Sequence, residues 1–318
     1  MTQTIRHLID TRIVIGIPTA GRPAIVAQTV HFLAQQTRLP DLVLLSVSDM
    51  AHAGGLETAD LPFPVEVVVG AKGLSLQRNA IIGKLVAPDL LMFLDDDFLM
   101  APDYLHEVAT LFADNPDIVL STGTVLADGI LGPGLTFAEG EKILAAATQS
   151  PAERRLNPVV NGYGCNMAIR AATVLAHGIR FDENLPLYSW LEDADFSAQL
   201  QPFGRFVQPT VTRGVHLGTK TGRTPGLNLG YSQIANPVYM WRKGTIAGPR
   251  VLRLVLRHLG SNLLGTLRPL PWADYRGRLM GNLKAIGDVC LGRSDPRRIL
   301  TFGAPRTYSD GRWRKTAP

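Results

Sequence analysis

The chain has 318 residues, of which 46% are hydrophobic, and a formal net charge of +5 with only two cysteines. These values leave room for a sizeable core in one large α/β domain with an extension, and they argue against a disulfide framework. Since no apolar run reaches bilayer length and no apolar segment follows the N-terminus, we expect neither a transmembrane helix nor a signal peptide, and a cytoplasmic location.

The first half of the chain alternates between strand-like and helix-like patterns. Short β-branched and apolar runs predict strands, and each is followed by a turn and a helical stretch. Pro18 closes the first strand, and Pro23 suits the first turn of the helix after it. We expect strands at 12–19, 42–48, 65–69, 90–94 and 118–125, and helices at 23–36, from 73 onward, and at 102–115. This alternation predicts βαβ units and a mostly parallel, twisted sheet flanked by helices.

Three consecutive carboxylates, Asp95, Asp96 and Asp97, directly follow the apolar run 90–94. A short, wholly apolar run is typical of a strand buried on both faces, and ligands of parallel sheets bind beyond the carboxyl ends of the strands. Three crowded carboxylates repel one another unless a cation neutralises them, and oxygen ligands favour Mg²⁺ or Mn²⁺. An exposed acidic turn is the simpler alternative.

The second half is less regular and becomes basic. A Gly-rich bend at 159–170 leads into a strand, a short helix is expected at 192–201, and a strand at 211–217 contains His216. From about residue 231 the pattern is helical. In 250–268 the arginines recur at three- or four-residue steps opposite an apolar side, which predicts an amphipathic helix with a cationic face.

A second basic helix is expected within 272–291. We therefore expect an α/β domain at 1–230 and a basic helical extension at 231–318. The charge asymmetry suggests an anionic partner for this extension, such as a phospholipid, a pyrophosphate-linked acceptor or nucleic acid. The apolar side of the first basic helix could instead pack on the core of the first domain.

These motifs, in this order, resemble the family 2 glycosyltransferases of the GT-A fold. The resemblance covers roughly residues 12–220. It rests on Ile17-Pro18-Thr19, Asp49, the segment 73–79, Asp95-Asp96-Asp97, Gly164-Cys165-Asn166-Met167 and Glu192-Asp193. Each motif is weak alone, and their order is what makes the set specific. The sequence departs from the family in the Trp190-Leu191 lead-in, which leaves the type of acceptor open.

The resemblance implies roles for the residues that would bind a nucleotide-diphospho-sugar. Pro18, Thr19 and Asp49 would hold the base, with Asp49 accepting a hydrogen bond from it. Arg78 would face the nucleotide or its phosphates, and Lys220 and Arg223 in a flexible loop would clamp the pyrophosphate. Each residue also has an ordinary explanation, as a turn former, a strand end or a solvated cation.

Within the acidic triplet, the resemblance implies that Asp95 binds the ribose and Asp97 the metal, while Asp96 supports either one. A late histidine often joins the metal in this fold, so His216 is the candidate for a further ligand. A lone histidine in a strand is otherwise an ordinary packed residue.

The resemblance also implies the reaction. A sugar hydroxyl is a poor nucleophile, and a base must take its proton as the new bond forms. Asp193 would be that base and Glu192 would orient the acceptor, although acidic residues also favour the first turn of any helix. Trp190 could stack on a sugar ring or fill the core.

The expected function is therefore an inverting, metal-dependent glycosyltransferase. Its acceptor would be a glycan or a lipid-linked saccharide in exopolysaccharide or cell-envelope synthesis, and the protein could attach to the inner face of the cell membrane. Two alternatives remain. One is a sugar-phosphate nucleotidyltransferase, which would normally carry a Gly-rich loop and a Lys after the first strand. The other is a non-catalytic, nucleotide-sugar-binding scaffold. Nucleic-acid binding is not expected, because the basic residues lack interleaved aromatics.

Overall fold

The computed structural model describes residues 11–87, 89–149, 152–221, 224–302, 306–309 and 312–315. The chain divides into two compact units. Unit 1 comprises Met1–Lys72, Leu76–Arg180 and Gln199–Thr219, and unit 2 comprises Gly73–Ser75, Phe181–Ala198 and Lys220–Pro318. This division differs from the sequence-based boundary at residue 230, since the segment that carries Glu192 and Asp193 belongs to unit 2.

An eight-stranded sheet forms the centre of unit 1, in the order β3-β2-β1-β4-β9-β6-β10-β8. Its strands are β1 (Ile13–Thr19), β2 (Leu42–Val47), β3 (Val65–Val69), β4 (Leu90–Leu94), β6 (Ile118–Thr122), β8 (Leu156–Pro158), β9 (Asn166–Arg170) and β10 (Arg205–Pro209). The first four run parallel, as the alternation predicted, and β6 is parallel to β10. β9 and β8 are antiparallel to their neighbours.

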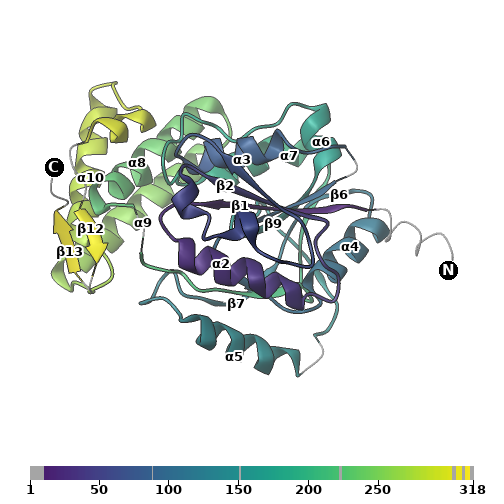
Figure 1. Cartoon of the computed structure of the whole chain (residues 1–318). Helices are drawn as coiled ribbons and strands as arrows, with labels where there is room; N and C mark the ends of the chain where they lie inside the picture. The colour runs from purple at the N-terminus through teal and green to yellow at the C-terminus, as the bar shows by residue number, and fades with distance from the viewer. Residues whose placement is uncertain are drawn as a thin grey trace. The chain divides into compact units, whose positions relative to one another are not determined.

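Helices cover both faces of this sheet. They are α2 (Pro23–Phe32), α3 (Leu74–Ile82), α4 (Tyr104–Asp114) and α6 (Ala171–Ala176). Figure 1 shows α2 and α4 on one face of the sheet and α3 and α6 on the other. Inward-facing residues of β1, β2 and β4 pack with α2 and α4 in the largest core cluster. β1 and β4 are buried along their whole length, as expected for central strands of a sheet covered on both faces.

A second, three-stranded sheet lies in the order β5-β11-β7. Its strands are β5 (Phe98–Met100), β7 (Thr124–Asp128) and β11 (Arg213–His216), and the helix α5 (Phe137–Thr148) packs on it. The single strand predicted at 118–125 is wrong. At Gly123 the chain leaves the first sheet and enters the second, where a Cβ would lie 2.1 Å from the Tyr104 hydroxyl.

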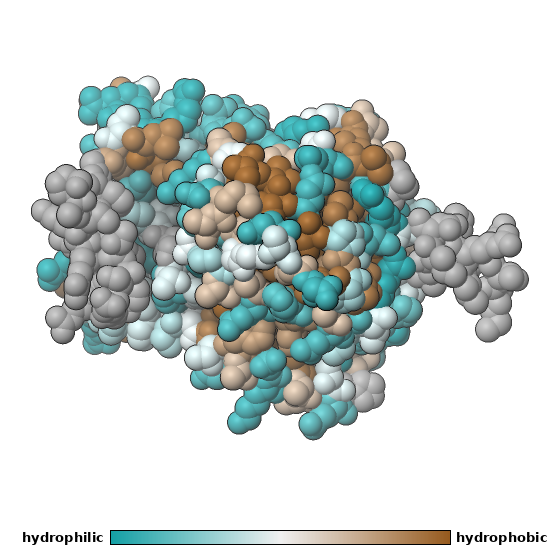
Figure 2. Space-filling view, viewed as in Figure 1, coloured by the Kyte–Doolittle hydropathy of each residue, from teal (hydrophilic) through white to brown (hydrophobic). Residues whose placement is uncertain are grey.

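The surface of unit 1 is mixed in polarity. In the view of Figure 2, hydrophobic residues gather above the centre, around α3 and α6, whereas the lowest part, over α5, is mainly hydrophilic. Among the described residues, no helix combines the length and the apolar character needed to cross a membrane.

Unit 2 is mostly helical and confirms the helical pattern expected from residue 231. It contains most of α7 (Glu192–Leu200), the helices α8 (Gly226–Lys243), α9 (Gly248–Leu267) and α10 (Tyr275–Cys290), a short 3-10 helix (Pro296–Thr301) and the hairpin β12 (Arg306–Ser309) and β13 (Arg312–Lys315). α8 and α10 pack closely at two glycines. A Cβ on Gly230 would lie 2.0 Å from the Arg278 carbonyl oxygen, and one on Gly281 would lie 2.2 Å from that of Leu227.

A buried polar cluster joins α8, α9 and α10. The Asn262 amide donates to Gln233 Oε1 at 2.8 Å and to Asn282 Oδ1 at 2.7 Å, and Asn282 donates to the Gly230 carbonyl at 2.6 Å. Asn262 and Asn282 are almost completely buried. Since a buried amide that loses its partners is costly, this cluster fixes the rotation of α9 about its axis.

Candidate functional site

The acidic triplet lies at the junction of the two sheets of unit 1. β4 ends at Leu94, the chain turns through Asp95–Asp97, and β5 begins at Phe98. The turn is closed by a hydrogen bond from the Phe98 amide to the Asp95 carbonyl, 3.2 Å. The side chain of Asp95 is 32% exposed, whereas those of Asp96 and Asp97 are almost completely buried. The three carboxylates therefore differ in environment although they are adjacent in sequence.

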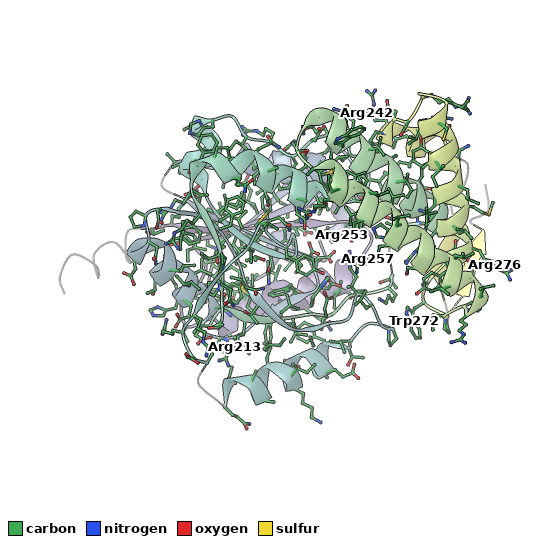
Figure 3. All side chains as sticks on the ribbon, turned by 180° about the vertical axis from the view of Figure 1, so that it is seen from behind. Arg213, Arg242, Arg253, Arg257, Trp272 and Arg276 are labelled. Carbon is green, nitrogen blue, oxygen red and sulfur yellow. The ribbon has the colours of Figure 1, made fainter. Side chains whose placement is uncertain are left out.

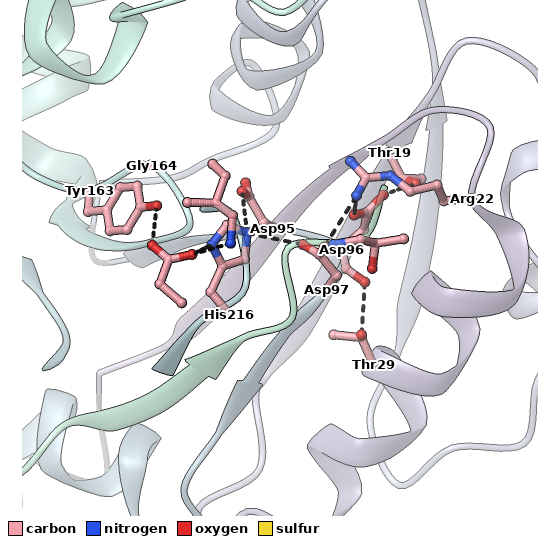
Figure 4. A network of polar contacts seen from close by, with 12 residues as sticks. Thr19, Arg22, Thr29, Asp95, Asp96, Asp97, Tyr163, Gly164 and His216 are labelled. Carbon is pink, nitrogen blue, oxygen red and sulfur yellow. Dashed lines mark hydrogen bonds and ion pairs between the residues drawn. The ribbon is translucent and has the colours of Figure 1, made fainter. Parts of the chain in front are cut away.

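The register of the second sheet brings His216 to this turn. β11 runs antiparallel to β5 and pairs His216 with Phe98, the residue after Asp97. Nε2 of His216 lies 3.4 Å from Asp97 Oδ1 and 3.8 Å from Asp95 Oδ2. Candidate ligand atoms of these three residues all lie within 4.8 Å of one another. The structure thus brings together Asp97 and His216, which the sequence analysis assigned to a metal, and adds Asp95, which it had assigned to the ribose (Figure 4).

Asp128, which the sequence analysis missed, holds the other side of the imidazole. β7 runs parallel to β11 and pairs Asp128 with His216. Oδ1 of Asp128 lies 3.0 Å from Nδ1 of His216, and its Oδ2 accepts a 2.8 Å hydrogen bond from the Tyr163 hydroxyl. A carboxylate on one ring nitrogen fixes the tautomer and leaves the other nitrogen as a ligand. No motif in the sequence marks Asp128, because it closes a strand that was not recognised as separate.

The electrostatics of this group follow from burial and charge. Burial alone would lower the pKa of His216, but the hydrogen bonds with Asp128 and Asp97 outweigh it and raise that pKa to about 10. Burial would also raise the pKa of Asp97, yet the hydrogen bond and charge of His216 hold it far below its usual range. Without a cation, the imidazolium neutralises part of the negative charge. A bound metal ion would neutralise the carboxylates instead, and the His216 ring would then be neutral.

Asp96 points away from this group and connects β1 to α2. Its Oδ2 accepts a 2.6 Å hydrogen bond from the Thr19 hydroxyl, and its carbonyl accepts one from Thr29 at 2.8 Å. Nη1 of Arg22 lies 3.2 Å from Asp96 Oδ1 and 3.4 Å from Asp97 Oδ2. Burial raises the pKa of Asp96 to about 7, against the opposing effects of Arg22 and Thr19. The sequence analysis did not single out Arg22.

Arg78 is buried next to the triplet. Its Nη2 donates to the Gly164 carbonyl at 2.9 Å and lies 3.6 Å from Asp95 Oδ1, and its guanidinium stands over the Phe93 ring, 5.3 Å from the centroid. The guanidinium thus connects the Gly-rich bend to the rim of the triplet. Its alternative explanation as a solvated surface arginine is wrong, because only 1% of its side chain is exposed.

The residues expected near the base lie at the carboxyl ends of β1 and β2. Pro18 and Thr19 are buried in β1 and pair with Ser46 and Val47 of β2. The Gln77 amide donates to the Thr19 and Ser46 carbonyls at 2.8 and 2.7 Å, which fixes the two strand ends together. Asp49 follows β2, is exposed, and caps the Ala51 amide at 2.9 Å. Their roles toward a nucleotide stay predictions.

The other predicted residues belong to unit 2. Glu192 and Asp193 open α7, directly after three non-glycine residues with positive φ: Leu187 (59°), Ser189 (51°) and Leu191 (72°). The Ser189 hydroxyl donates to the Leu185 carbonyl at 2.5 Å.

This strained turn is held from two sides within the unit. The Leu187 carbonyl accepts from the Leu74 amide at 2.7 Å, and that of Trp190 accepts from Asn236 at 2.9 Å. Such strain persists only where the surroundings enforce it, and it is frequent at functional sites. Lys220 begins the last segment of the unit and is half-buried, whereas Arg223 lies outside the described residues.

Comparisons with known proteins identify the fold. No protein-family model and no curated protein matches the sequence. Among solved structures, the mannosyltransferase PcManGT from Pyrobaculum calidifontis, in complex with GDP-Man and Mn²⁺, matches with a TM-score of 0.51 at 13% identity, over 88% of this chain and 86% of that one. S. aureus TarS 1–349 in complex with UDP matches with a TM-score of 0.50 at 12% identity, over 96% of each chain.

A longer S. aureus TarS structure also matches, with a TM-score of 0.47 at 14% identity. The match covers 64% of this chain, which spans only 36% of that structure. The solved neighbours are glycosyltransferases with a GT-A-like fold, and the fold expected from the sequence is confirmed.

Proposed function

We propose that the chain is an inverting glycosyltransferase that moves a sugar from a nucleotide-diphospho-sugar to a hydroxyl of a glycan or lipid-linked acceptor. Fold alone does not decide function, so the proposal rests on the site. Its main support is the group formed by Asp95, Asp97 and His216, with Asp128 behind the histidine, at the carboxyl end of a buried strand.

These residues fit a divalent cation. Two carboxylates and one imidazole nitrogen supply three ligand atoms, which leaves further positions for water and phosphate oxygens, as Mg²⁺ and Mn²⁺ require. His216 would bind through Nε2, because Nδ1 faces Asp128. The cation would supply electrostatic stabilisation of the negative charge that develops on the leaving diphosphate. The GT-A-like mannosyltransferase neighbour was solved with both Mn²⁺ and a nucleotide sugar.

The residues around the triplet would bind the rest of the donor. Asp95, the most exposed of the three carboxylates, would offer one oxygen to the cation and accept a hydrogen bond from the ribose with the other. Pro18, Thr19 and Asp49 would line the base. Arg78 would act through Asp95 and the Gly164 carbonyl, which it contacts, and so hold the rim of the site in place.

The remaining donor contacts would come from the loop that begins at Thr219. Its amide donates to Asp97 Oδ2 at 2.7 Å, so this loop starts at the metal-binding carboxylate itself. Lys220 and Arg223 follow directly, and their cationic side chains would neutralise the diphosphate.

Asp193 would serve as the base. In one displacement the acceptor oxygen bonds to the anomeric carbon, the bond from that carbon to the diphosphate oxygen breaks, and the hydroxyl proton passes to the Asp193 carboxylate. Attack opposite the leaving group inverts the anomeric configuration. Glu192, in the same first turn of α7, would orient the acceptor, and the enforced positive-φ backbone before it would hold both carboxylates in place.

A donor screen followed by a transfer assay tests the proposal. The purified chain is mixed with Mn²⁺ and a panel of nucleotide sugars, and thermal shift selects the donor that stabilises it. Release of nucleoside diphosphate is then measured with candidate acceptors, and the anomeric configuration of the product is determined by NMR. We expect stabilisation by one donor only with metal, and loss of transfer in Asp97→Ala and Asp193→Ala with the fold retained.

The two alternative functions, a nucleotidyltransferase and a non-catalytic scaffold, predict different results in these assays. Pyrophosphate release from a nucleoside triphosphate and a sugar phosphate would instead identify a nucleotidyltransferase. Donor binding without hydrolysis or transfer would identify a scaffold. Wild-type transfer by Asp193→Asn would refute the assignment of the base alone, and leave the donor site unaffected.

A further inference from the structure

Helix α9 exposes an apolar stripe that the fold of unit 2 does not cover. Five leucines on this helix are more than half exposed. They are Leu252 (61%), Leu256 (60%), Leu263 (52%), Leu264 (67%) and Leu267 (72%). Four of them recur at steps of four, seven and four residues and therefore lie along one side of the helix. An isolated exposed leucine is ordinary, but a continuous row on one helix marks an interaction surface.

The exposure is a property of the packed helix and does not result from a loose end. Val251 and Asn262 are buried, and Val255 packs in the core of unit 2. The hydrogen bonds from Asn262 to Gln233 and Asn282 fix the rotation of α9. The helix thus has two apolar strips. One faces α8 and α10, and the other faces outward.

Arginines flank the outward strip. Arg253 and Arg257 are exposed and lie one turn apart on the helix (Figure 3). The helical period places both beside the row of leucines. Arg250, in the first turn, falls on the same flank, Arg268 directly follows the last residue of the helix, and α9 contains no acidic residue.

The surrounding segment has the same charge. Residues 220–318 contain eighteen lysines and arginines against four carboxylates, so the positive charge of the whole chain is concentrated there. A partner for this face must therefore be apolar and anionic at once.

Trp241, near the end of α8, places an aromatic side chain beside the start of α9. It is 55% exposed, and its indole nitrogen would lie 3.4 Å from a Cβ on Gly248, the first residue of the helix. Tryptophan favours the boundary between hydrocarbon and headgroups, where its ring is apolar and its N–H can meet a polar partner. The N-terminal end of the leucine strip thus carries the side chain type that anchors interfacial helices.

We propose that α9 docks unit 2 on an anionic phospholipid surface. The leucine strip would enter the acyl boundary with the helix parallel to the membrane plane, and Arg250, Arg253, Arg257 and Arg268 would contact lipid phosphates. This attachment is independent of sugar transfer. It would bring a lipid-linked acceptor within reach by confining the enzyme to the surface where such acceptors lie.

Vesicle flotation tests this without donor, metal or acceptor, so its failure leaves the proposed reaction untouched. The full chain is incubated with vesicles of phosphatidylcholine alone, or of equal parts phosphatidylcholine and phosphatidylglycerol. We expect flotation only with the anionic vesicles. The double variant Leu256→Glu/Leu263→Glu should lose at least about tenfold in partition.

Arginine and control variants complete the test. In Arg253→Gln/Arg257→Gln, partition onto the anionic vesicles should fall roughly 25-fold at low salt, at about fivefold per charge removed. The loss should be much smaller at high salt, which screens the attraction. Leu156→Glu is the matched control, since Leu156 is 42% exposed on β8 of unit 1. It should float like the wild type, and all variants should keep the wild-type melting temperature.

Two outcomes would overturn the proposal. One is equal flotation of the wild type and the double leucine variant, which would show that α9 is not the contact. The other is a stable dimer in solution, by light scattering, that the leucine variant dissociates while the wild type fails to float. In that case a second copy of the chain covers the strip.

Discussion

Asp128 and His216 face each other at the ends of neighbouring parallel strands, with Oδ1 of the carboxylate 3.0 Å from Nδ1 of the ring. Nε2, on the far side of the ring, faces Asp97 at 3.4 Å. The order β5-β11-β7 thus places an inner carboxylate, the imidazole and an outer carboxylate in one row. The Asp128 carboxylate fixes the orientation of the His216 ring and leaves Nε2 as the nitrogen that can bind a metal. Asp128 is therefore a positioning residue for the proposed metal site.

Replacing Asp128 by Asn should weaken metal binding while keeping the fold. The amide is neutral, and it no longer favours the tautomer with the proton on Nδ1. Loss of an outer partner of this kind typically costs about 10–100-fold in metal affinity. Titration of Mn²⁺ followed by electron paramagnetic resonance measures the loss directly.

Tyr163→Phe is the matched control for this variant. It removes only the hydroxyl that donates to Asp128 Oδ2. Its effect on Mn²⁺ affinity should be clearly smaller than that of Asp128→Asn. Wild-type affinity in Asp128→Asn would refute the positioning role.

The two buried aspartates of the triplet should respond differently to the same substitution. In Asp96→Asn the amide oxygen can still accept from Thr19, and the neutral side chain resembles the protonated acid that burial favours. We expect a stability change within about 1 kcal/mol and nearly wild-type Mn²⁺ affinity. Asp97→Asn should reduce Mn²⁺ affinity by more than the roughly 10–100-fold that is typical when a residue behind a metal ligand, such as Asp128, is replaced. Equal losses in both variants would contradict the separate roles.

The sequence predicted the acidic triplet, its place after a buried strand and the late histidine, because these depend on local patterns. It did not predict Asp128. Residues 118–128 form one apolar, β-branched stretch with a single glycine, and nothing local shows that the chain changes sheets at Gly123. Only the folded structure shows that the Tyr104 ring, 19 residues away in the chain, occupies the space a side chain at 123 would need. The sequence therefore predicted the proposed metal site only in part, because the position of Asp128 depends on tertiary packing.

The same limit applies to α9 and Arg78. Periodicity predicted an amphipathic helix, but it assigned all apolar residues to one face. Which of them are covered depends on α8 and α10, whose positions the pattern does not contain. The resemblance predicted a role for Arg78, yet the burial of this side chain against Phe93 and Gly164 depends on residues 15 and 86 positions away in the chain.

Gly214 is expected to be essential for the position of His216, two residues further along β11. A Cβ at Gly214 would lie 2.2 Å from Phe98 Cζ and 2.8 Å from the Leu99 carbonyl oxygen, so Gly214→Ala must push β11 away from β5. We expect a loss of about 1–3 kcal/mol in unfolding free energy, measured by denaturant titration, together with weaker Mn²⁺ binding. Gly132→Ala, with no atom within 4 Å of its Cβ, should change neither quantity. A fully stable Gly214→Ala variant would show that the two strands are not so tightly paired.

The ion pairs of Lys243 should set the acid and alkaline limits of stability of unit 2. Its Nζ lies 2.7 Å from both Asp182 Oδ2 and Asp195 Oδ2. Burial opposes the charged form of Asp182, but its hydrogen bonds, with that from Lys243 foremost, hold its pKa below the ordinary 3.8. Burial likewise opposes the charge on Lys243, but both carboxylates raise its pKa above 10.5. The stabilisation should therefore be complete between about pH 4 and 10.5.

Lys243→Met would remove the ammonium group that lies 2.7 Å from the fully buried Asp195 carboxylate, and would keep the hydrogen bond from the Thr245 hydroxyl. At neutral pH we expect a loss of about 3 kcal/mol, at the lower end for a broken buried pair because Lys243 is 30% exposed. Since the lowered pKa of Asp182 gives stability that is lost as the pH falls through it, the difference from the wild type should shrink in acid. It should also shrink as the pH rises through the raised pKa of Lys243. Chemical denaturation across the pH range measures this, with Arg297→Met, which removes an exposed pair with Asp295, as a control that stays at wild-type stability. A pH-independent difference would show that Lys243 stabilises the unit by packing and not by charge.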